Sequence, residues 1–328
     1  MGIKHLNNFL RTECGESIKA ITIAELSGKK IAVDISIYMY KYESSDALIE
    51  NMYLMLATFR QYNIIPIFVF DGKPPTEKKA LLQKRKEDKK EAEKEYNILK
   101  QKLEINNLSE DDKQEIISNM DILKKQIIYI NREKISIVKN LIRCYGLTYY
   151  DAPGEADELC ALLVLKNKVW ACLSEDMDMF VYGCTRVIRY LSLFKGTAVL
   201  YDIKGILEKL ELTQKELREI CVLSGTDYNI QTCDKTKNNP KLYETIKLFN
   251  KYKKEKEKEN VNLEFYEWIK NTSLYITDYE LLKNIYDIFD LKNTNLTTFE
   301  KIKIVNSPID SENIKNILKT DGFIFPPK

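Results

Sequence analysis

Three short apolar segments, each running into an aspartate, constrain the fold of this chain more than any other feature. The first ends at Asp34, the second at Asp71, and the third leads into Asp176 and Asp178. Apolar runs of this length, separated by helical patterns, indicate strands that are buried on both faces of a parallel sheet. In such sheets ligands bind beyond the carboxyl ends of the strands. We therefore expect an α/β fold, with a mostly parallel central sheet flanked by helices and an acidic cluster at one edge.

Other acids follow predicted elements in the same way. Glu155 and Asp157 open the helix expected over 156–165, where the positive end of the helix dipole tolerates negative charge, and Asp227 follows the helix expected over 214–224. Any one such acid, taken alone, is more often a cap or turn residue. Several acids at the ends of separate strands indicate a common site. The candidate metal ligands are Asp34, Asp71, Glu155, Asp157, Asp176, Asp178 and Asp227.

Acids gathered in a partly buried pocket repel one another, and divalent cations neutralise that charge. Mg²⁺ prefers carboxylate, water and phosphate oxygens as ligands. Two such ions about 3.5–4 Å apart can activate a water molecule and stabilise the leaving oxygen of a phosphodiester. We therefore expect divalent metal ions, Mg²⁺ with Mn²⁺ as a substitute, at these acids.

The histidine content excludes several other chemistries. His5 is the single histidine, so Ser-His-Asp or Cys-His catalysis would need His5 itself, and a zinc site rich in histidine is excluded. The 7 cysteines are scattered without a CxxC pair, which is typical of a reducing compartment, either nucleus or cytoplasm. No apolar run is long enough to span a membrane, so we do not expect a membrane among the partners of this protein.

The charge distribution contains one basic segment in a chain whose net charge is only +2. Eight Lys or Arg residues stand against three acids between Lys73 and Lys90. Such a segment can bind nucleic acid, although a charge run is usually a solvated helix face. The pattern predicts four regions: a core over 1–75, a helical insertion over 76–140, a second core part over 141–228 and a helical C-terminal region over 229–328. Within the last, Lys253–Asn260 is expected to be a solvated connection.

Six sequence blocks occur in a characteristic order: MGI, VDIS, VFDGKPP, DAPGEADELCA, SEDMDMFVYG and LSGTDY. Over roughly residues 1–250 they resemble the flap endonuclease branch of the structure-specific 5′ nucleases. The resemblance implies a PIN-like nuclease core and two Mg²⁺ ions at the seven acids. It also implies cleavage of branched or nicked DNA at 5′ flaps, nicks or gaps, in DNA replication or repair.

The resemblance also assigns roles outside the acidic cluster. The insertion is similar to the arch of the family, and Lys78 and Arg85 match its two basic residues that act on the scissile phosphate. Because they are seven residues apart, both can lie on one face of a helix. Tyr40 matches a ring that stacks on a base beside the cut. As an alternative, Tyr40 is a core aromatic residue.

The sequence departs from the family pattern at four places. Asp157 replaces a more usual glutamate, and the segment between Asp34 and Asp71 is short. The helix–two-turn–helix loop lacks the glycines that often bind K⁺. Phosphate contacts there are expected from the lysines of this region, which are Lys235, Lys237, Lys241 and Lys247. The C-terminal Phe323 and Phe325 lack the glutamine of a sliding-clamp peptide, so no clamp is evident and we expect a monomer.

Three alternatives belong beside this prediction. The protein could act mainly as a 5′–3′ exonuclease. It could be a junction-binding module without catalysis, although no acid of the metal site has been lost. The FVFDG segment also suits a phosphatase with an aspartate nucleophile, but that chemistry needs a second acid two residues later, where Lys73 stands.

Overall fold

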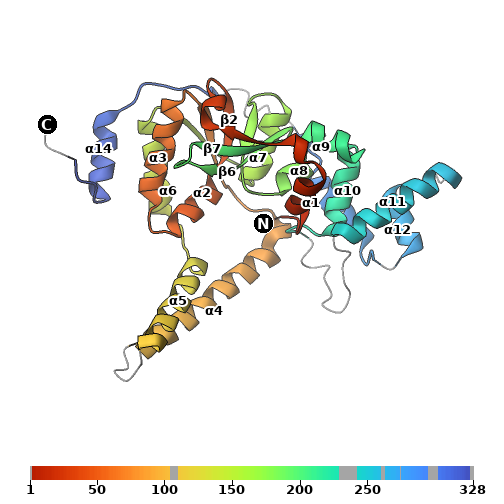
Figure 1. Cartoon of the computed structure of the whole chain (residues 1–328), viewed down its shortest axis with the longest axis horizontal. Coiled ribbons are helices and arrows are strands. Elements are labelled where there is room, and N and C mark those ends of the chain that lie inside the picture. Colours follow the sequence, from red (N-terminus) through yellow and green to blue (C-terminus); the bar gives the residue numbers. More distant parts are fainter. Residues whose placement is uncertain are drawn as a thin grey trace.

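The computed structural model describes residues 2–103, 110–228, 242–259, 263–273, 275–294 and 302–325. A sheet of seven strands, in the order β1-β7-β6-β5-β2-β3-β4, forms the centre of this described part (Figure 1). The strands are β1 (Ile18–Thr22), β2 (Lys30–Asp34), β3 (Ile65–Phe70), β4 (Thr148–Asp151), β5 (Ala171–Leu173), β6 (Arg186–Ser192) and β7 (Thr197–Asp202).

Strand direction places the carboxyl ends of most strands at one edge. The neighbours β6, β5, β2, β3 and β4 run parallel, whereas β7 and β1 pair antiparallel at one side. The predicted mostly parallel sheet is therefore confirmed. Alternate side chains of one strand face opposite ways, so Ala32 and Ile67 enter one core while Val33 and Phe68 enter the other.

Helices cover both faces of the sheet (Figure 1). The first core includes residues of α1 and of α7 to α13, and the second includes residues of α2, α3, α6 and α14. Their bounds are α1 (Leu6–Glu13), α2 (Ile35–Glu43), α3 (Leu48–Gln61), α6 (Arg132–Cys144), α7 (Ala156–Leu165), α8 (Asp178–Tyr182), α9 (Ile203–Leu210), α10 (Gln214–Ser224), α11 (Leu242–Glu259), α12 (Phe265–Thr272), α13 (Tyr279–Ile288) and α14 (Ser311–Thr320).

The insertion forms two long helices, α4 (Lys79–Leu103) and α5 (Glu110–Gln126), which lie side by side and project from the body (Figure 1). Most of α4 is charged, and Leu81 and Ala92 are its buried residues. A helix with so little apolar surface cannot pack into a core along its length. Its charged side chains therefore remain available beside the sheet edge from which it starts.

Two predicted helices, α7 and α10, have the expected bounds, and Thr213 with Glu216 forms a capping box at the start of α10. The connection expected at Lys253–Asn260 is wrong, because α11 continues through Glu259 and Asn260 lies outside the described residues. Lys and Glu are good helix formers, and the Lys251–Glu255 pair at 3.7 Å supports the helix. Among the described residues, no helix combines the length and apolarity that crossing a bilayer requires.

Candidate active site

A cavity of about 540 Å³ lies at the carboxyl edge of the parallel strands. Acids from separate segments line it together with arch residues. The lining acids are Asp34, Asp71, Glu155, Asp157, Asp176 and Asp227, and Asp178 is buried beside them. The structure therefore brings six of the seven predicted acids onto one cavity. The seventh, Asp178, lies close to them: burial raises its pKa, and the charges of Asp176, Asp157 and Asp227 raise it further.

Strand ends and helix starts position these acids. Asp34 is the last residue of β2, and Asp71 directly follows β3. Glu155 is the N-cap residue of α7 and Asp157 lies in its first turn, as the sequence predicts. Asp71 also joins two segments, because its Oδ1 accepts a hydrogen bond of 2.9 Å from the backbone N–H of Ala156. These four acids thus lie where the ends of β2 and β3 meet the start of α7.

The segment that carries Asp176 and Asp178 differs from the prediction. The sequence predicts a strand that leads into both acids, but β5 ends at Leu173 and α8 begins at Asp178, whose N–H donates to Asp176 Oδ1 at 3.0 Å. Ser174, which sequence reasoning missed, is fully buried here. Its hydroxyl donates to Asp34 Oδ2 and accepts from the N–H of Asp176, each at 3.1 Å. Ser174 thereby ties the acid of β2 to the loop that follows β5.

The acidic cluster carries more negative charge than its protein surroundings compensate. Burial raises the pKa of Asp34 well above its usual range, and Asp71, Asp157 and Asp176 raise it further. Burial likewise raises the pKa of Asp157 to about 8, against the lowering effect of Lys78. Asp178 Oδ1 is buried and accepts no hydrogen bond from any described residue. An orphaned carboxylate oxygen in such a cluster calls for a cation.

Two cations from the start of the arch reach into the acids. Lys78 ends the 3₁₀ turn before α4, and its Nζ lies 2.6 Å from Glu155 Oε2. Burial lowers the pKa of Lys78, but Asp157 and Glu155 outweigh burial, so the pKa is raised overall and the ammonium is kept. Arg85 Nη2 lies 2.9 Å from Asp227 Oδ2. Both predicted basic residues thus contact predicted metal-site acids.

Tyr228 is a second residue that sequence reasoning missed. Its hydroxyl donates to Glu155 Oε2 at 2.6 Å, and its ring centre lies 4.8 Å from Lys78 Nζ. The ring therefore holds the ammonium against the carboxylate by a cation–π contact. Its position directly after Asp227 was the available signal. The backbone offers a further close approach, because a Cβ on Gly2 would lie 2.7 Å from an oxygen of both Asp176 and Asp178.

The donor set suits a hard cation, because all of its side-chain donors are carboxylate oxygens. As the side chains stand, no three acids, cysteines or histidines within the described ranges form a ready-made ligand shell. The reason is visible in the contacts: Lys78 holds Glu155, and Arg85 holds Asp227. The chemistry of the site therefore fits divalent cations once these ion pairs open.

The structure describes only some of the residues predicted to contact DNA. Tyr40 lines the cavity and is 45% exposed, so it is not the core aromatic residue of the alternative interpretation. Lys247 is exposed on α11. Lys235, Lys237 and Lys241 lie outside the described residues, as does the rest of the loop predicted for the divergent helix–two-turn–helix region.

Comparison with known proteins identifies the family. The XPG N-terminal domain matches residues 1–92 and the XPG I-region matches residues 146–227, which together make up more than half of the chain. Flap endonuclease 1 of Zea mays is 32% identical over 256 residues, covering 72% of this chain and 63% of the relative. The chain belongs to the flap endonuclease family. Flap endonuclease 1 of Lodderomyces elongisporus is 29% identical over 247 residues, covering 70% of this chain and 61% of that relative. This member of the family thus matches a little over three fifths of the length of these relatives.

Solved structures show that the fold is shared. The catalytic core of Rad2 in complex with a DNA substrate superposes with a TM-score of 0.65 at 21% identity, covering 95% of this chain and 94% of that one. Flap endonuclease-1 from Methanococcus jannaschii gives a TM-score of 0.62 at 23% identity, covering 93% of this chain and 90% of that one. The predicted nuclease-type α/β core of the family is therefore confirmed.

Proposed function

We propose that this protein is a structure-specific 5′ nuclease that hydrolyses DNA phosphodiesters at 5′ flaps, nicks or gaps, in DNA replication or repair. One observation carries the proposal: six acids share a cavity with four cations, Lys78 directly before α4 and Arg85, Lys86 and Lys89 on it. Two of these cations, Lys78 and Arg85, are ion-paired with two of the acids. Family membership supports the same conclusion. The six free cysteines among the described residues suit a reducing compartment, nucleus or cytoplasm.

Two Mg²⁺ ions, for which Mn²⁺ can substitute, are the cofactors that we assign to this cavity. Bound there, they would lower the pKa of a water molecule and stabilise the charge on a leaving oxygen. The proposed ligands are Asp34, Asp71, Glu155, Asp157, Asp176, Asp178 and Asp227. Ser174 fixes the distance between two of these segments by holding Asp34 and the backbone of Asp176.

The protein side chains position the DNA and stabilise charge. Lys78 and Arg85 would donate to the non-bridging oxygens of the scissile phosphate once they leave Glu155 and Asp227. Tyr40 offers its exposed ring to a base beside the cut. Lys247 and the lysines at 235, 237 and 241 would contact the duplex phosphates. We propose that the protein acts on branched or nicked DNA as a monomer.

Cleavage of a substrate panel tests this proposal. Labelled 5′-flap, nicked, bubble and four-way DNA are incubated with Mg²⁺ or with EDTA, and the cut positions are mapped. We expect metal-dependent cuts near the junction of flap or nicked DNA. Asp176→Asn should lose at least about a thousandfold in rate, because it removes one carboxylate charge from the metal site, while DNA binding persists. Asp202→Asn, an exposed acid outside the cavity, serves as the matched control. Full activity of Asp176→Asn, or cleavage that is unaffected by EDTA, would overturn the assignment.

A further inference from the structure

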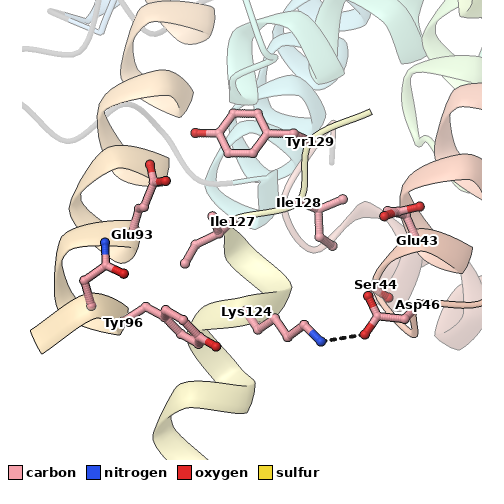
Figure 2. Close-up of a pocket in the computed structure, with 10 residues that line it drawn as sticks. Glu43, Ser44, Asp46, Glu93, Tyr96, Lys124, Ile127, Ile128 and Tyr129 are labelled. Atoms are coloured by element: carbon pink, nitrogen blue, oxygen red, sulfur yellow. Dashed lines mark hydrogen bonds and ion pairs between the residues drawn. The ribbon is translucent and has the colours of Figure 1, made fainter. Parts of the chain in front are cut away.

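Tyr129 lies in the segment between α5 and α6, at the wall shared by two cavities. One is the active-site cavity, and the other is a cavity of about 350 Å³ between the arch and the end of α2. Figure 2 shows Tyr129 with its ring extending from this segment toward α4, above Ile127 and Ile128. The ring is 53% exposed, so apolar burial in the core does not account for its position.

Lys89 of α4 fixes the ring of Tyr129 relative to Tyr40. Lys89 Nζ lies 5.0 Å from the ring centre of Tyr129 and 5.3 Å from that of Tyr40. It also donates a hydrogen bond of 2.7 Å to the backbone oxygen of Ile128. One ammonium group thus holds the two half-exposed rings at the mouth of the acidic cavity, with each ring in cation–π contact.

We propose that Tyr129 is a second stacking platform for a nucleobase of the unpaired 5′ strand, one position beyond the base that Tyr40 contacts. This inference rests on the proposed function. Every base has a π-face, so stacking on an aromatic side chain suits a single strand of any sequence. Lys89 forms no ion pair with a carboxylate in the described ranges, so its ammonium can face the phosphate that joins the two bases.

The charges that line the second cavity bear on whether a base or a phosphate of the 5′ strand would contact Tyr129. Glu43, Asp46 and Glu93 line that cavity, but two of them are already ion-paired: Asp46 with Lys124 at 2.5 Å (Figure 2) and Glu43 with Lys134. Lys124 is the cation that lines this cavity, and its charge is already paired, so the lining offers a phosphate backbone little attraction, whereas a neutral base needs none. The strand is therefore expected to place a base on the ring of Tyr129 and to keep its phosphates beside Lys89.

The test compares Tyr129→Ala and Tyr129→Phe with Tyr275→Ala, an exposed tyrosine that lines neither cavity. Substrates are a nick without a flap, a flap of five nucleotides, and the same flap with an abasic site at its first or second unpaired position. We expect Tyr129→Ala to raise KM for the intact flap about tenfold, the usual cost of one lost stack, with an unchanged single-turnover rate at saturation. Tyr129→Phe and Tyr275→Ala should behave like the unsubstituted protein.

The abasic flaps separate stacking from a purely structural role. If Tyr129 stacks on a base, an abasic site at one of the two positions should raise KM of the unsubstituted protein about tenfold. The same abasic site should not raise KM of Tyr129→Ala any further. The inference would be overturned if Tyr129→Ala raised KM equally for the nick and for the flap. It would also be overturned if the effects of the substitution and of the abasic site on KM were additive. Failure of the unsubstituted protein to cut any substrate would refute the proposed function instead. Binding of the same flaps in EDTA, followed by fluorescence anisotropy, would then still decide whether Tyr129 stacks.

Discussion

At the scale of single residues, the central feature is the pairing of arch cations with acids of the proposed metal site. Lys78 and Arg85 neutralise Glu155 and Asp227, respectively. In the proposed function these two donors would contact the scissile phosphate, and Tyr228 packs against the lysine. Positively charged donors held in a desolvated cavity stabilise developing charge strongly, because little reorganisation is needed during the reaction.

Removal of either cation should therefore act mainly on the chemical step. Lys78→Ala and Arg85→Ala are each expected to lower the single-turnover cleavage rate about a hundredfold or more, with a much smaller change in flap affinity. Lys84→Ala, on the exposed part of α4, is the matched control for loss of arch charge. Rapid-quench measurements at saturating protein give the rate. A variant that weakens binding but cleaves at the normal rate once bound would argue for a steering role instead.

At the scale of elements, the ends of strands were predictable and the short turns between them were not. Asp34 and Asp71 could be placed because parallel strands end at a common edge. The helix that starts at Asp178 has five residues, too few for an apolar period to appear. Ser174 gave no signal, since a serine after a strand suits many turns, and its role depends on Asp34, which is 140 residues away. The Lys/Glu run of α11 was mistaken for a linker because its charge concealed its helix propensity.

The helix α10 carries a buried acid whose titration should be measurable. Glu219 is 7% exposed, and burial raises its pKa to about 7, against the lowering effect of Lys215. Between about pH 4.5 and 7 the folded state thus keeps a proton that the unfolded state has released. The free energy of unfolding should fall with rising pH in this window, by about 3 kcal/mol at most, and level off above it.

Glu219→Gln isolates this contribution. Urea denaturation at pH 5 and pH 8 gives the free energy of unfolding of both proteins. The change in the free energy of unfolding between pH 5 and pH 8 should be smaller in the variant. The acids of the cavity titrate in both proteins, so their contribution cancels in the comparison. An unchanged pH dependence would mean that Glu219 is paired and ionised throughout.

At the scale of the whole molecule, the sheet separates two cores, and the acidic edge is where segments of both meet. Asp34 and Asp178 are nearly inaccessible, and burial raises the pKa of each. Mutual repulsion at this edge opposes folding of the metal-free protein. Divalent cations that bind the folded state should relieve this repulsion and stabilise the entire domain.

We therefore expect Mg²⁺ to raise the melting temperature relative to EDTA at pH 8. Metal at about a hundred times its dissociation constant contributes about 2.7 kcal/mol. NaCl of equal ionic strength is the control for screening, and Asp176→Asn should lose most of the Mg²⁺ effect. Differential scanning calorimetry measures both. Equal shifts with NaCl and MgCl₂ would show that screening, rather than bound metal, stabilises the protein.

The contact of Gly2 with two of these acids has a practical consequence for anyone who makes the protein. No side chain fits at this position, because a Cβ would overlap carboxylate oxygens of Asp176 and Asp178. The backbone at Gly2 therefore packs directly against two of the proposed metal ligands. Affinity tags and fluorophores belong near α14, which lies at one end of the body and away from the N-terminus (Figure 1), where they leave the packing of Gly2 intact.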